Sequence, residues 1–213
     1  ISFIITLLNS GISNIYIFFG YIQNNRTYDI RKTPSRAGII TEIFRRMPEV
    51  LRSMHPTHPV CAKGKMAEWF TESHHKDPTP YGPHSPFAKL EEQDGSIAGF
   101  GFPPDEHISN IHTFEDRLGD QFPYHVYNET PYNFTLIDRD GLSSDYQGLV
   151  HNTMSGRHDI SILINALIEQ NQLIQVGFRN QPCFSMRARH IDRTLAELFE
   201  LGITLYGKRK TGI

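Results

Sequence analysis

The sequence is poor in cysteine, has no excess of basic residues and contains no long apolar run. Its 213 residues include two cysteines, Cys61 and Cys183, which cannot build a disulfide framework and favour a reducing, cytoplasmic setting. Lysine and arginine number 21 against 23 acidic residues, so the net charge of −2 gives no reason to expect a nucleic-acid partner. We therefore expect a cytoplasmic protein that does not bind nucleic acid.

The first 22 residues are markedly apolar but do not have the pattern of a membrane-spanning helix. Asn9, Ser10, Gly11, Ser13 and Asn14 interrupt them, so no run of about 20 apolar residues is present. A basic start and a small-residue cleavage site, which mark a signal peptide, are also missing. We expect no membrane association, and we interpret the first residue, which is not Met, as the start of an N-terminally incomplete chain.

Three common catalytic signatures are absent as well. No Gly-x-Gly-x-x-Gly fingerprint follows a strand, no phosphate loop ends in Gly-Lys-Ser or Gly-Lys-Thr, and no Gly-x-Ser-x-Gly elbow is present. The chain therefore carries none of the usual marks of a dinucleotide-binding enzyme, a P-loop protein or an α/β hydrolase.

Patterns typical of helices and of strands alternate along the sequence. Residues 159–170 and 192–201 have the apolar spacing of amphipathic helices, and residues 173–178 between them have the composition of a strand. The glycine-rich segment Ser96–Phe102 predicts a strand buried on both faces, with a neighbour packed closely against its backbone. The alternation predicts the α/β class: residues 1–213 as a single-domain α/β/α layered fold with a central mixed sheet.

The segment Arg52–Pro86 holds five of the eleven histidines and six of the thirteen prolines. Histidines titrate near neutrality, and prolines fix turns that can hold polar side chains in place, so this composition indicates a site. His55, His58 and Cys61 have the spacing of zinc ligands, but the prolines between them disfavour a helix and no fourth ligand is placed.

The other histidines of this segment carry less information. Adjacent side chains diverge on a helix or a strand, so we interpret His74 and His75 as residues of a solvated loop. His84 stands just before Ser85 and Pro86, which begin a predicted helix. An anionic group would be favoured at such a position, and the role of His84 stays open.

His112 and Glu115 are three residues apart in a predicted helix over residues 108–118. Residues at this spacing share a helix face, so the carboxylate can orient the imidazole and stabilise its charge. A histidine held by a carboxylate is suited to general base catalysis. Many surface helices carry such a pair in solvent, which is the alternative interpretation.

Asp138, Asp140 and Asp145 form an acidic group after a predicted strand. The segment resembles a calcium loop only superficially, because the spacing of its acidic residues is not sustained and no glutamate occupies the twelfth position. We interpret it as a polar turn.

Four segments in order resemble the aminoglycoside 3-N-acetyltransferase family over roughly residues 12–150: TPSRAGIITEIFRRMPEVLRSMHP, TPYGPHSPFAKL, the glycine-rich strand and NIHTFED. The resemblance implies an acetyl-CoA-dependent enzyme with an α/β fold of its own. It also implies that the N-terminal strand of the family, and a loop that helps to hold coenzyme A, are missing from this chain.

The resemblance further implies a role for several residues. His112 matches the base that takes a proton from the acceptor amine, and Glu115 matches its partner. The positions that line the cleft for the acyl donor are Arg52, Ser53, His55 and Ser85. The positions that face a cationic acceptor are Tyr28, Asp29, Asp138, Asp140 and Asp145.

From this resemblance we expect an antibiotic-resistance enzyme that transfers an acetyl group directly from acetyl-CoA to an amine of an aminoglycoside. We expect no metal, and a homodimer is a candidate assembly. Three alternatives stay open: an acyltransferase for a nucleotide-linked amino sugar or other small amine, a non-catalytic ligand-binding relative, and a zinc protein built on His55, His58 and Cys61.

Overall fold

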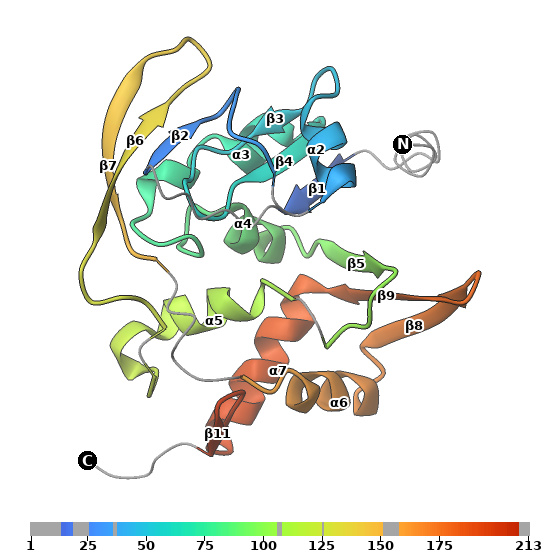
Figure 1. Ribbon diagram of the computed structural model, residues 1–213. Helices are drawn as coiled ribbons and strands as arrows, with labels where there is room; N and C mark the ends of the chain where they lie inside the picture. The colour runs from blue at the N-terminus through green and yellow to red at the C-terminus, as the bar shows by residue number, and fades with distance from the viewer. Residues whose placement is uncertain are drawn as a thin grey trace. The chain divides into compact units, whose positions relative to one another are not determined.

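The computed structural model describes residues 14–18, 26–35, 38–105, 108–124, 126–150 and 158–208 (Figure 1). The chain divides into two compact units. Unit 1 comprises Ile1–Pro86 and Tyr127–His151, and unit 2 comprises Phe87–Val126 and Asn152–Ile213. The prediction of a single domain over the whole chain stays a prediction.

Unit 1 contains two three-stranded sheets, with orders β1-β4-β3 and β2-β6-β7. Its strands are β1 (Asn14–Phe18), β2 (Thr27–Asp29), β3 (Leu51–Arg52), β4 (Val60–Gly64), β6 (Tyr132–Ile137) and β7 (Ser143–Gly148). Its helices are α2 (Ile39–Arg45), α3 (Ala67–Thr71) and the short 3-10 helix η1 (His74–Lys76). The first sheet is antiparallel, whereas the second is mixed, because β2 runs parallel to β6 and β7 runs antiparallel to it.

The mixed sheet of unit 1 has one buried face. Phe134 and Leu136 alternate along β6 with less buried residues, as the two-residue period of a strand requires. They pack with Tyr28 and Ile30 next to β6, and with Tyr146 of β7. This packing holds the long β6–β7 hairpin, drawn in yellow in Figure 1, beside β2.

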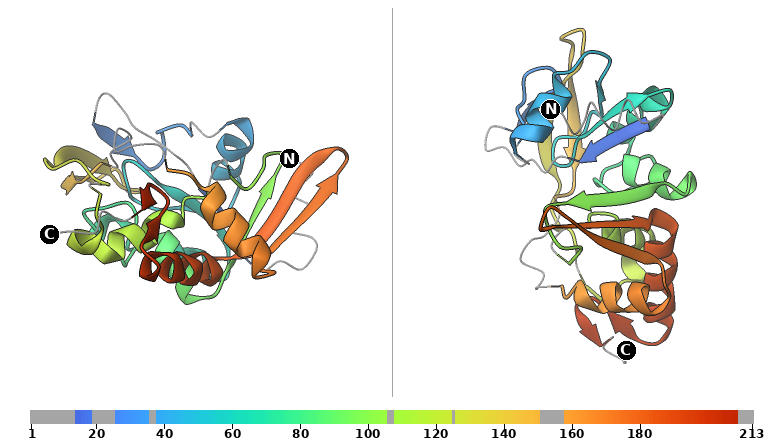
Figure 2. Two further views of the ribbon diagram at one scale, coloured as in Figure 1. Left: turned by 90° about the horizontal axis from the view of Figure 1, so that it is seen from below. Right: turned by 90° about the vertical axis from the view of Figure 1, so that its right-hand side faces the viewer.

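Unit 2 pairs an antiparallel sheet of order β5-β9-β8 with several helices and a small hairpin, β10–β11. Its strands are β5 (Ser96–Phe100), β8 (Leu173–Phe178), β9 (Gln181–Arg187), β10 (Ile203–Thr204) and β11 (Gly207–Lys208). Its helices are α4 (Pro86–Glu92), α5 (Ile111–Leu118), η2 (Gly119–Gln121), α6 (Ser161–Glu169) and α7 (Ala188–Glu200). Helices α5, α6 and α7 lie on one side of the three-stranded sheet (Figures 1 and 2).

The core of unit 2 lies between these helices and the sheet. Leu163 and Leu167 of α6 are fully buried, at helical spacing, against residues that include Phe184 and Met186 of β9. Gly99 of β5 faces the ring of Phe184 so closely that a Cβ atom would overlap it. The predicted close approach to this glycine-rich strand is therefore confirmed.

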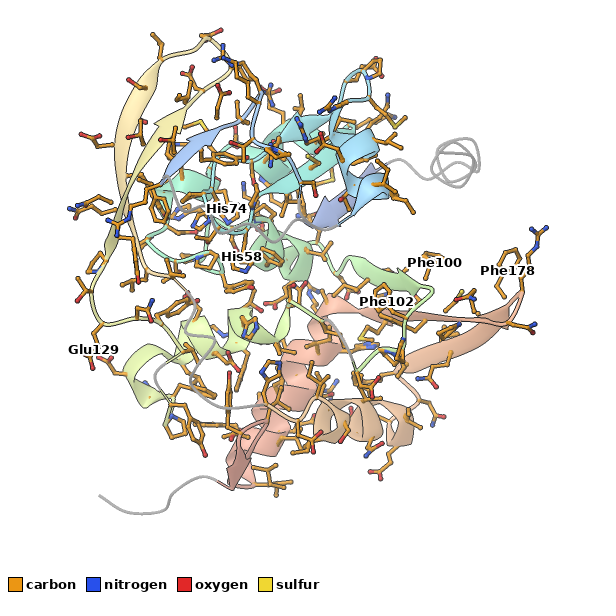
Figure 3. All side chains as sticks on the ribbon, in the orientation of Figure 1. His58, His74, Phe100, Phe102, Glu129 and Phe178 are labelled. Atoms are coloured by element: carbon orange, nitrogen blue, oxygen red, sulfur yellow. The ribbon has the colours of Figure 1, made fainter. Side chains whose placement is uncertain are left out.

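The opposite face of the same sheet is exposed. Ile174, Val176 and Phe178 of β8 are each more than half exposed, and Phe100 of β5 is 48% exposed. Figure 3 shows Phe178 near the end of the β8–β9 hairpin, away from the helices of unit 2. The prediction that residues 96–102 are buried on both faces is wrong, because only the helix side of this strand is covered within the unit.

The structure confirms the α/β class, but its described strands are divided among several sheets where a central one was expected. Strand β8 has the predicted bounds, and α6 lies within residues 159–170. The predicted loss of the N-terminal strand and coenzyme loop concerns the start of the chain, outside the described residues. In the part of the chain that is described, no helix is both long and apolar enough to cross a bilayer.

Adjacent residues of α6 provide a matched test of the unit 2 core. Leu167 is fully buried, whereas the side chain of Ile168 next to it is 46% exposed. We expect Leu167→Ala to lower the free energy of unfolding by about 2–5 kcal/mol, because it removes apolar contacts and leaves a cavity. Ile168→Ala should change it by less than about 1 kcal/mol, since it removes little buried area. Urea denaturation of both variants measures the difference, and similar losses would contradict this description of the core.

Candidate active site

His112 and Glu115 form a buried pair on the inner side of α5. The Nδ1 atom of His112 lies 2.7 Å from Oε2 of Glu115, and the side chains are 11% and 3% exposed. Helix α5 brings them together because they are one turn apart on its buried face, as the sequence predicted. The alternative of a solvated surface pair is therefore excluded.

The tautomer of His112 follows from this contact. A carboxylate accepts hydrogen bonds, so the Nδ1–H group of His112 donates to Glu115, and the lone pair that can take up a proton lies on Nε2. Burial lowers the pKa of His112 to about 3, and the nearby imidazole of His158, with ring centroids 5.8 Å apart, lowers it further. His112 is therefore neutral near pH 7, the state that a general base requires.

A small apolar cavity of about 10 Å³ lies beside Glu115 in unit 2. Its walls come from α5, η2, α7 and the β10 region, and most of its lining side chains are hydrophobic: Phe114, Phe122, Leu195, Leu198, Phe199, Ile203 and Leu205. A space of this size holds at most one water molecule, so it is no substrate site.

In unit 1, Ser53 and His74 belong to one buried network. The Nε2 atom of His74 lies 2.9 Å from the carbonyl oxygen of Pro80, so Nε2 carries the proton and Nδ1 accepts from the Ser53 hydroxyl at 2.9 Å. The Ser53 Oγ atom in turn accepts from the backbone N–H of Val60. His74 is fully buried inside unit 1 (Figure 3) and stacks on His55 with ring centroids 4.4 Å apart. The prediction that His74 lies in a solvated loop is wrong, since its imidazole joins two loops.

His55 is also engaged on both ring nitrogens. Nδ1 accepts from the backbone N–H groups of Thr57 and His58, each at 3.4 Å, so Nε2 carries the proton. That proton is donated to the Tyr146 hydroxyl at 3.0 Å, and Tyr146 donates to the carbonyl oxygen of Asp77 at 2.6 Å. Burial lowers the pKa of His55 well below its ordinary value, and the neighbouring imidazoles of His74 and His58 lower it further. His55 is therefore a neutral histidine that holds loop segments together.

Asp77 fixes the loop that ends at Ser85. One of its carboxylate oxygens accepts from the backbone N–H of His84 and the other from Nδ1 of the same residue, both at 2.7 Å. A side chain at Gly82 would overlap the Asp77 carboxylate, so this close approach requires glycine. Asp77 is buried, whereas about half of the His84 side chain is exposed. Ser85 is fully buried directly after His84, at the start of α4.

Arg52 and Tyr28 pack against each other. The Arg52 guanidinium carbon lies 5.0 Å from the centre of the Tyr28 ring, and Nη1 donates to the carbonyl oxygens of Thr33 at 2.5 Å and Ile30 at 3.4 Å. The Tyr28 hydroxyl donates to the carbonyl oxygen of Ser53 at 2.9 Å. Two residues predicted for different ligands, Arg52 for the acyl donor and Tyr28 for the acceptor, are thus neighbours.

Arg31 lies among three of the four aspartates predicted to face a cationic acceptor. Its guanidinium makes two contacts of 3.1 Å with the carboxylate of Asp29, which hold the pKa of Asp29 below its ordinary value. Asp29 is the main cause of the raised pKa of Arg31, and Asp138 and Asp140 add to it. Arg31 therefore forms an ion pair with Asp29 and interacts electrostatically with Asp138 and Asp140.

Asp145 does not belong to the turn that contains the other two aspartates of its segment. It is exposed on β7, opposite Thr135 of β6, whereas Asp138 accepts the backbone N–H groups of Asp140 and Leu142 in the β6–β7 turn. The predicted turn is thus correct at Asp138 and Asp140, and the prediction that it extends to Asp145 is wrong, because β7 begins at Ser143.

The zinc trio is not assembled. Within the described part of the chain, no three histidine, cysteine, aspartate or glutamate side chains are grouped so that they could hold a metal ion. His55 uses both ring nitrogens in the contacts above, and Cys61 is a buried free thiol of β4 whose pKa burial raises to about 12. A thiol that stays protonated is a poor zinc ligand.

Sequence reasoning missed Tyr146 and Asp77 as parts of this arrangement. Tyr146 lies 91 positions from His55 in the sequence, and only the pairing of β7 with β6 brings it into the network. Asp77 had a local signal, since an aspartate among prolines and a glycine is typical of a turn whose side chain binds backbone N–H groups.

Comparison with known proteins places these features in a wider context. A family model described as aminoglycoside 3-N-acetyltransferase matches residues 20–200. Aminoglycoside N(3)-acetyltransferase VII of Streptomyces paromomycinus is 34% identical in an alignment of 122 residues that covers 53% of this chain and 42% of that enzyme. The chain thus matches less than half the length of this curated relative.

Two solved structures illustrate the likeness of the fold. A binary complex of AAC-IIIb with CoASH has a TM-score of 0.74 at 18% identity, covering 94% of this chain and 83% of that one. AAC-VIa bound to sisomicin has a TM-score of 0.75 at 18% identity, covering 94% of this chain and 84% of that one. At such identities the comparison shows a common fold.

The buried neutral histidines predict a pH dependence of stability. In the unfolded chain a histidine takes up a proton near pH 6.5, but folding lowers the pKa of His55 well below that value and that of His112 to about 3. The unfolded state then binds more protons below pH 6.5, so the free energy of unfolding should fall as the pH is lowered. The slope should approach about 1.4 kcal/mol per pH unit for each such histidine.

Urea denaturation between about pH 5 and 8 measures this slope. His55→Gln removes one of the two groups, so its slope should be shallower than that of the original chain. A slope that His55→Gln leaves unchanged would contradict a buried neutral His55.

Proposed function

This chain belongs to the aminoglycoside 3-N-acetyltransferase family, and on that basis we propose that it transfers the acetyl group of acetyl-CoA to an amine of an aminoglycoside. The observation that carries the proposal is the buried His112–Glu115 pair, a neutral imidazole fixed by a carboxylate. The relatives named above support the choice of ligands, because one was solved with CoASH and another with sisomicin.

The reaction that we propose is a direct transfer with His112 as general base. An ammonium group is not nucleophilic, so the amine passes a proton to Nε2 of His112 as its nitrogen attacks the thioester carbon. The tetrahedral intermediate then collapses, the carbon–sulfur bond breaks, and the proton goes from His112 to the departing thiolate. Glu115 keeps the imidazole in the required tautomer and balances its transient positive charge.

We propose that the network around Ser53, His55 and Ser85 shapes the part of unit 1 that holds the acyl donor. His55 and Ser53 are buried and hydrogen bonded within the protein, so their contribution is to fix loops, not to bind through their own polar atoms. Asp77 connects these loops, since it accepts from Tyr146 on one side and from His84, next to Ser85, on the other. Such a rigid support favours the orientation of two substrates, which supplies much of the rate of a direct transfer.

A second candidate acceptor is favoured by the position of Arg31. A polycationic aminoglycoside would have to compete with this guanidinium for Asp29 and would be repelled by its charge near Asp138 and Asp140. A nucleotide-linked amino sugar, whose phosphates are anionic, would instead be attracted by Arg31. The two acceptors therefore predict opposite effects of removing this one charge.

Removal of the base is the first test of the reaction. We expect His112→Ala to lower the rate of thiol release from acetyl-CoA by about 100-fold or more, because the reaction then loses the group that takes the proton of the amine. The assay follows free thiol with a panel of aminoglycosides and amino sugars. His75→Ala, which changes an exposed histidine of η1, is the control and should keep the original rate.

Two outcomes of this test contradict parts of the proposal. A near-normal rate in His112→Ala would remove His112 from the reaction. If the original chain releases no thiol with any acceptor, calorimetry with coenzyme A decides the next step: binding without turnover would indicate the non-catalytic relative, and no binding would contradict the enzyme altogether.

Arg31→Ala distinguishes the two classes of acceptor. For an aminoglycoside we expect KM to fall several-fold with little change in kcat, because Asp29 loses its ion-pair partner and a positive charge near Asp138 and Asp140 is removed. For a nucleotide-linked amino sugar we expect KM to rise, because the anion loses its counter-charge. Steady-state kinetics with one compound of each class measures both effects, and an unchanged KM for both would exclude this acidic group from acceptor binding.

A further inference from the structure

The hydroxyl of Tyr206 lies beside the His112–Glu115 pair and is not used by the reaction described above. Tyr206 stands in the turn between β10 and β11, and its phenol oxygen is buried without a hydrogen-bond partner of ordinary geometry among the described residues. The Glu115 carboxylate is close enough to this phenol to raise its pKa beyond the effect of burial. A buried hydroxyl without a partner is unfavourable, so a neighbouring carboxylate is its natural acceptor.

The ring of Tyr206 is held from several directions. The ring of Tyr124 stacks on it with centroids 4.9 Å apart, and His158 and Phe122 contact it with centroids 5.8 Å and 5.9 Å away. The backbone N–H of Tyr206 donates to the Thr204 hydroxyl at 3.2 Å, which fixes the turn. This packing on several sides leaves the phenol few orientations.

We propose that Tyr206 is a positioning residue that donates a hydrogen bond to Glu115 and so completes the support of His112. The proposal rests on the proposed role of His112 as the base. In it, Glu115 accepts from two sides, from Nδ1 of His112 through Oε2 and from the Tyr206 hydroxyl. A carboxylate has enough lone pairs for both bonds.

Tyr206 can act in this arrangement only as a donor. Burial raises the pKa of its phenol above the ordinary value, and the negative charge of Glu115 raises it further, so the hydroxyl keeps its proton at any working pH. This separates its role from that of His112, whose lowered pKa keeps the imidazole unprotonated.

Other charged groups on α5 and on the elements packed against it lie further along the helix. Glu91 of α4 contacts Thr113 and Arg117, and Asp192 of α7 contacts Arg117. The titratable side chains that contact His112 are Glu115 and His158, and Tyr206 contacts the ring of His158.

The proposed hydrogen bond has a measurable effect on His112. A donor on Glu115 draws part of the negative charge of the carboxylate away from the imidazole. If the donor is removed, Glu115 stabilises the imidazolium more strongly, and the pKa of His112 rises. The sign of this change does not depend on the acceptor or on the rate of the reaction.

The test compares Tyr206→Phe with Tyr124→Phe. Each variant loses one hydroxyl from the same stacked pair, but the Tyr124 hydroxyl is directed to the carbonyl oxygen of Tyr206, at 3.4 Å. The pKa of the His112 ring is measured by NMR titration of its nitrogens in the full chain. We expect Tyr206→Phe to raise it by about 0.5 or more, and Tyr124→Phe to leave it within about 0.2 of the original value. Equal values in all three proteins would overturn the proposal.

A double variant removes effects of altered packing. In a Glu115→Gln background residue 115 has no negative charge that a hydrogen bond could draw away from the imidazole. Tyr206→Phe should therefore produce no additional rise in the pKa of His112 in this background. A rise of the same size in both backgrounds would show that the phenol acts without Glu115 and would also overturn the proposal. These NMR measurements need no turnover. A negative result in them is therefore distinguishable from a negative result in the acetyltransferase assay.

Where turnover is found, the pH profile adds a second readout. The acid limb of kcat/KM should move to higher pH in Tyr206→Phe by the same amount as the NMR pKa, and Tyr124→Phe should keep the original limb. A variant that merely loosens the β10–β11 turn would lower the melting temperature without moving this limb, and that outcome would contradict a positioning role.

Discussion

A polar side chain that leaves water must find a hydrogen-bond partner inside the protein, and the polar interior of both units follows from this constraint. In unit 1 the fully buried His74 joins the Ser53 hydroxyl to the Pro80 carbonyl, and His55 joins a backbone turn to Tyr146. In unit 2 the buried Glu115 is matched by the imidazole of His112. His55 and His112 are neutral because burial opposes their charged forms, and the tautomer of each of the three histidines follows from the groups that it contacts.

The same constraint separates supporting histidines from a reactive one. His55 and His74 have both ring nitrogens engaged with neighbouring groups, so a proton taken up by either would break an existing bond. His112 differs because its carboxylate partner is negatively charged and can stabilise an imidazolium for the lifetime of a proton transfer. A carbonyl or hydroxyl partner gives less support of this kind. The nature of the partner therefore distinguishes a base from a structural imidazole.

Local patterns in the sequence predicted what depends on local structure. The helical spacing of His112 and Glu115 predicted their contact, and the composition of residues 173–178 predicted strand β8 with its bounds. Thr33 stands before a proline, where a helix could begin, but α2 begins at Ile39, because Thr33 accepts the backbone N–H of Asp29 and stabilises a turn. Propensity alone does not distinguish these two uses of a hydroxyl.

Contacts between distant segments could not be predicted in this way. Strand β7 contains Ser143, Ser144 and Asp145, whose composition is that of a turn, and it forms because β6 offers it a full ladder of partners. The burial of His74, the capture of Asp29 by Arg31 and the link from His55 to Tyr146 all need the tertiary structure. The candidate site was therefore predictable where it lies on one helix, and not where several loops build it.

The contact of Asp77 with Gly82 has a consequence for how this chain can diversify. Any side chain at position 82 would displace the carboxylate that holds His84, and loss of that carboxylate would release the loop before Ser85. Positions 77, 82 and 84 must therefore change together or not at all. Asp140, exposed in the β6–β7 turn, carries no comparable linkage to the loops around His55. Libraries intended to alter acceptor preference would retain more folded members if they varied this turn and kept the Asp77 loop intact.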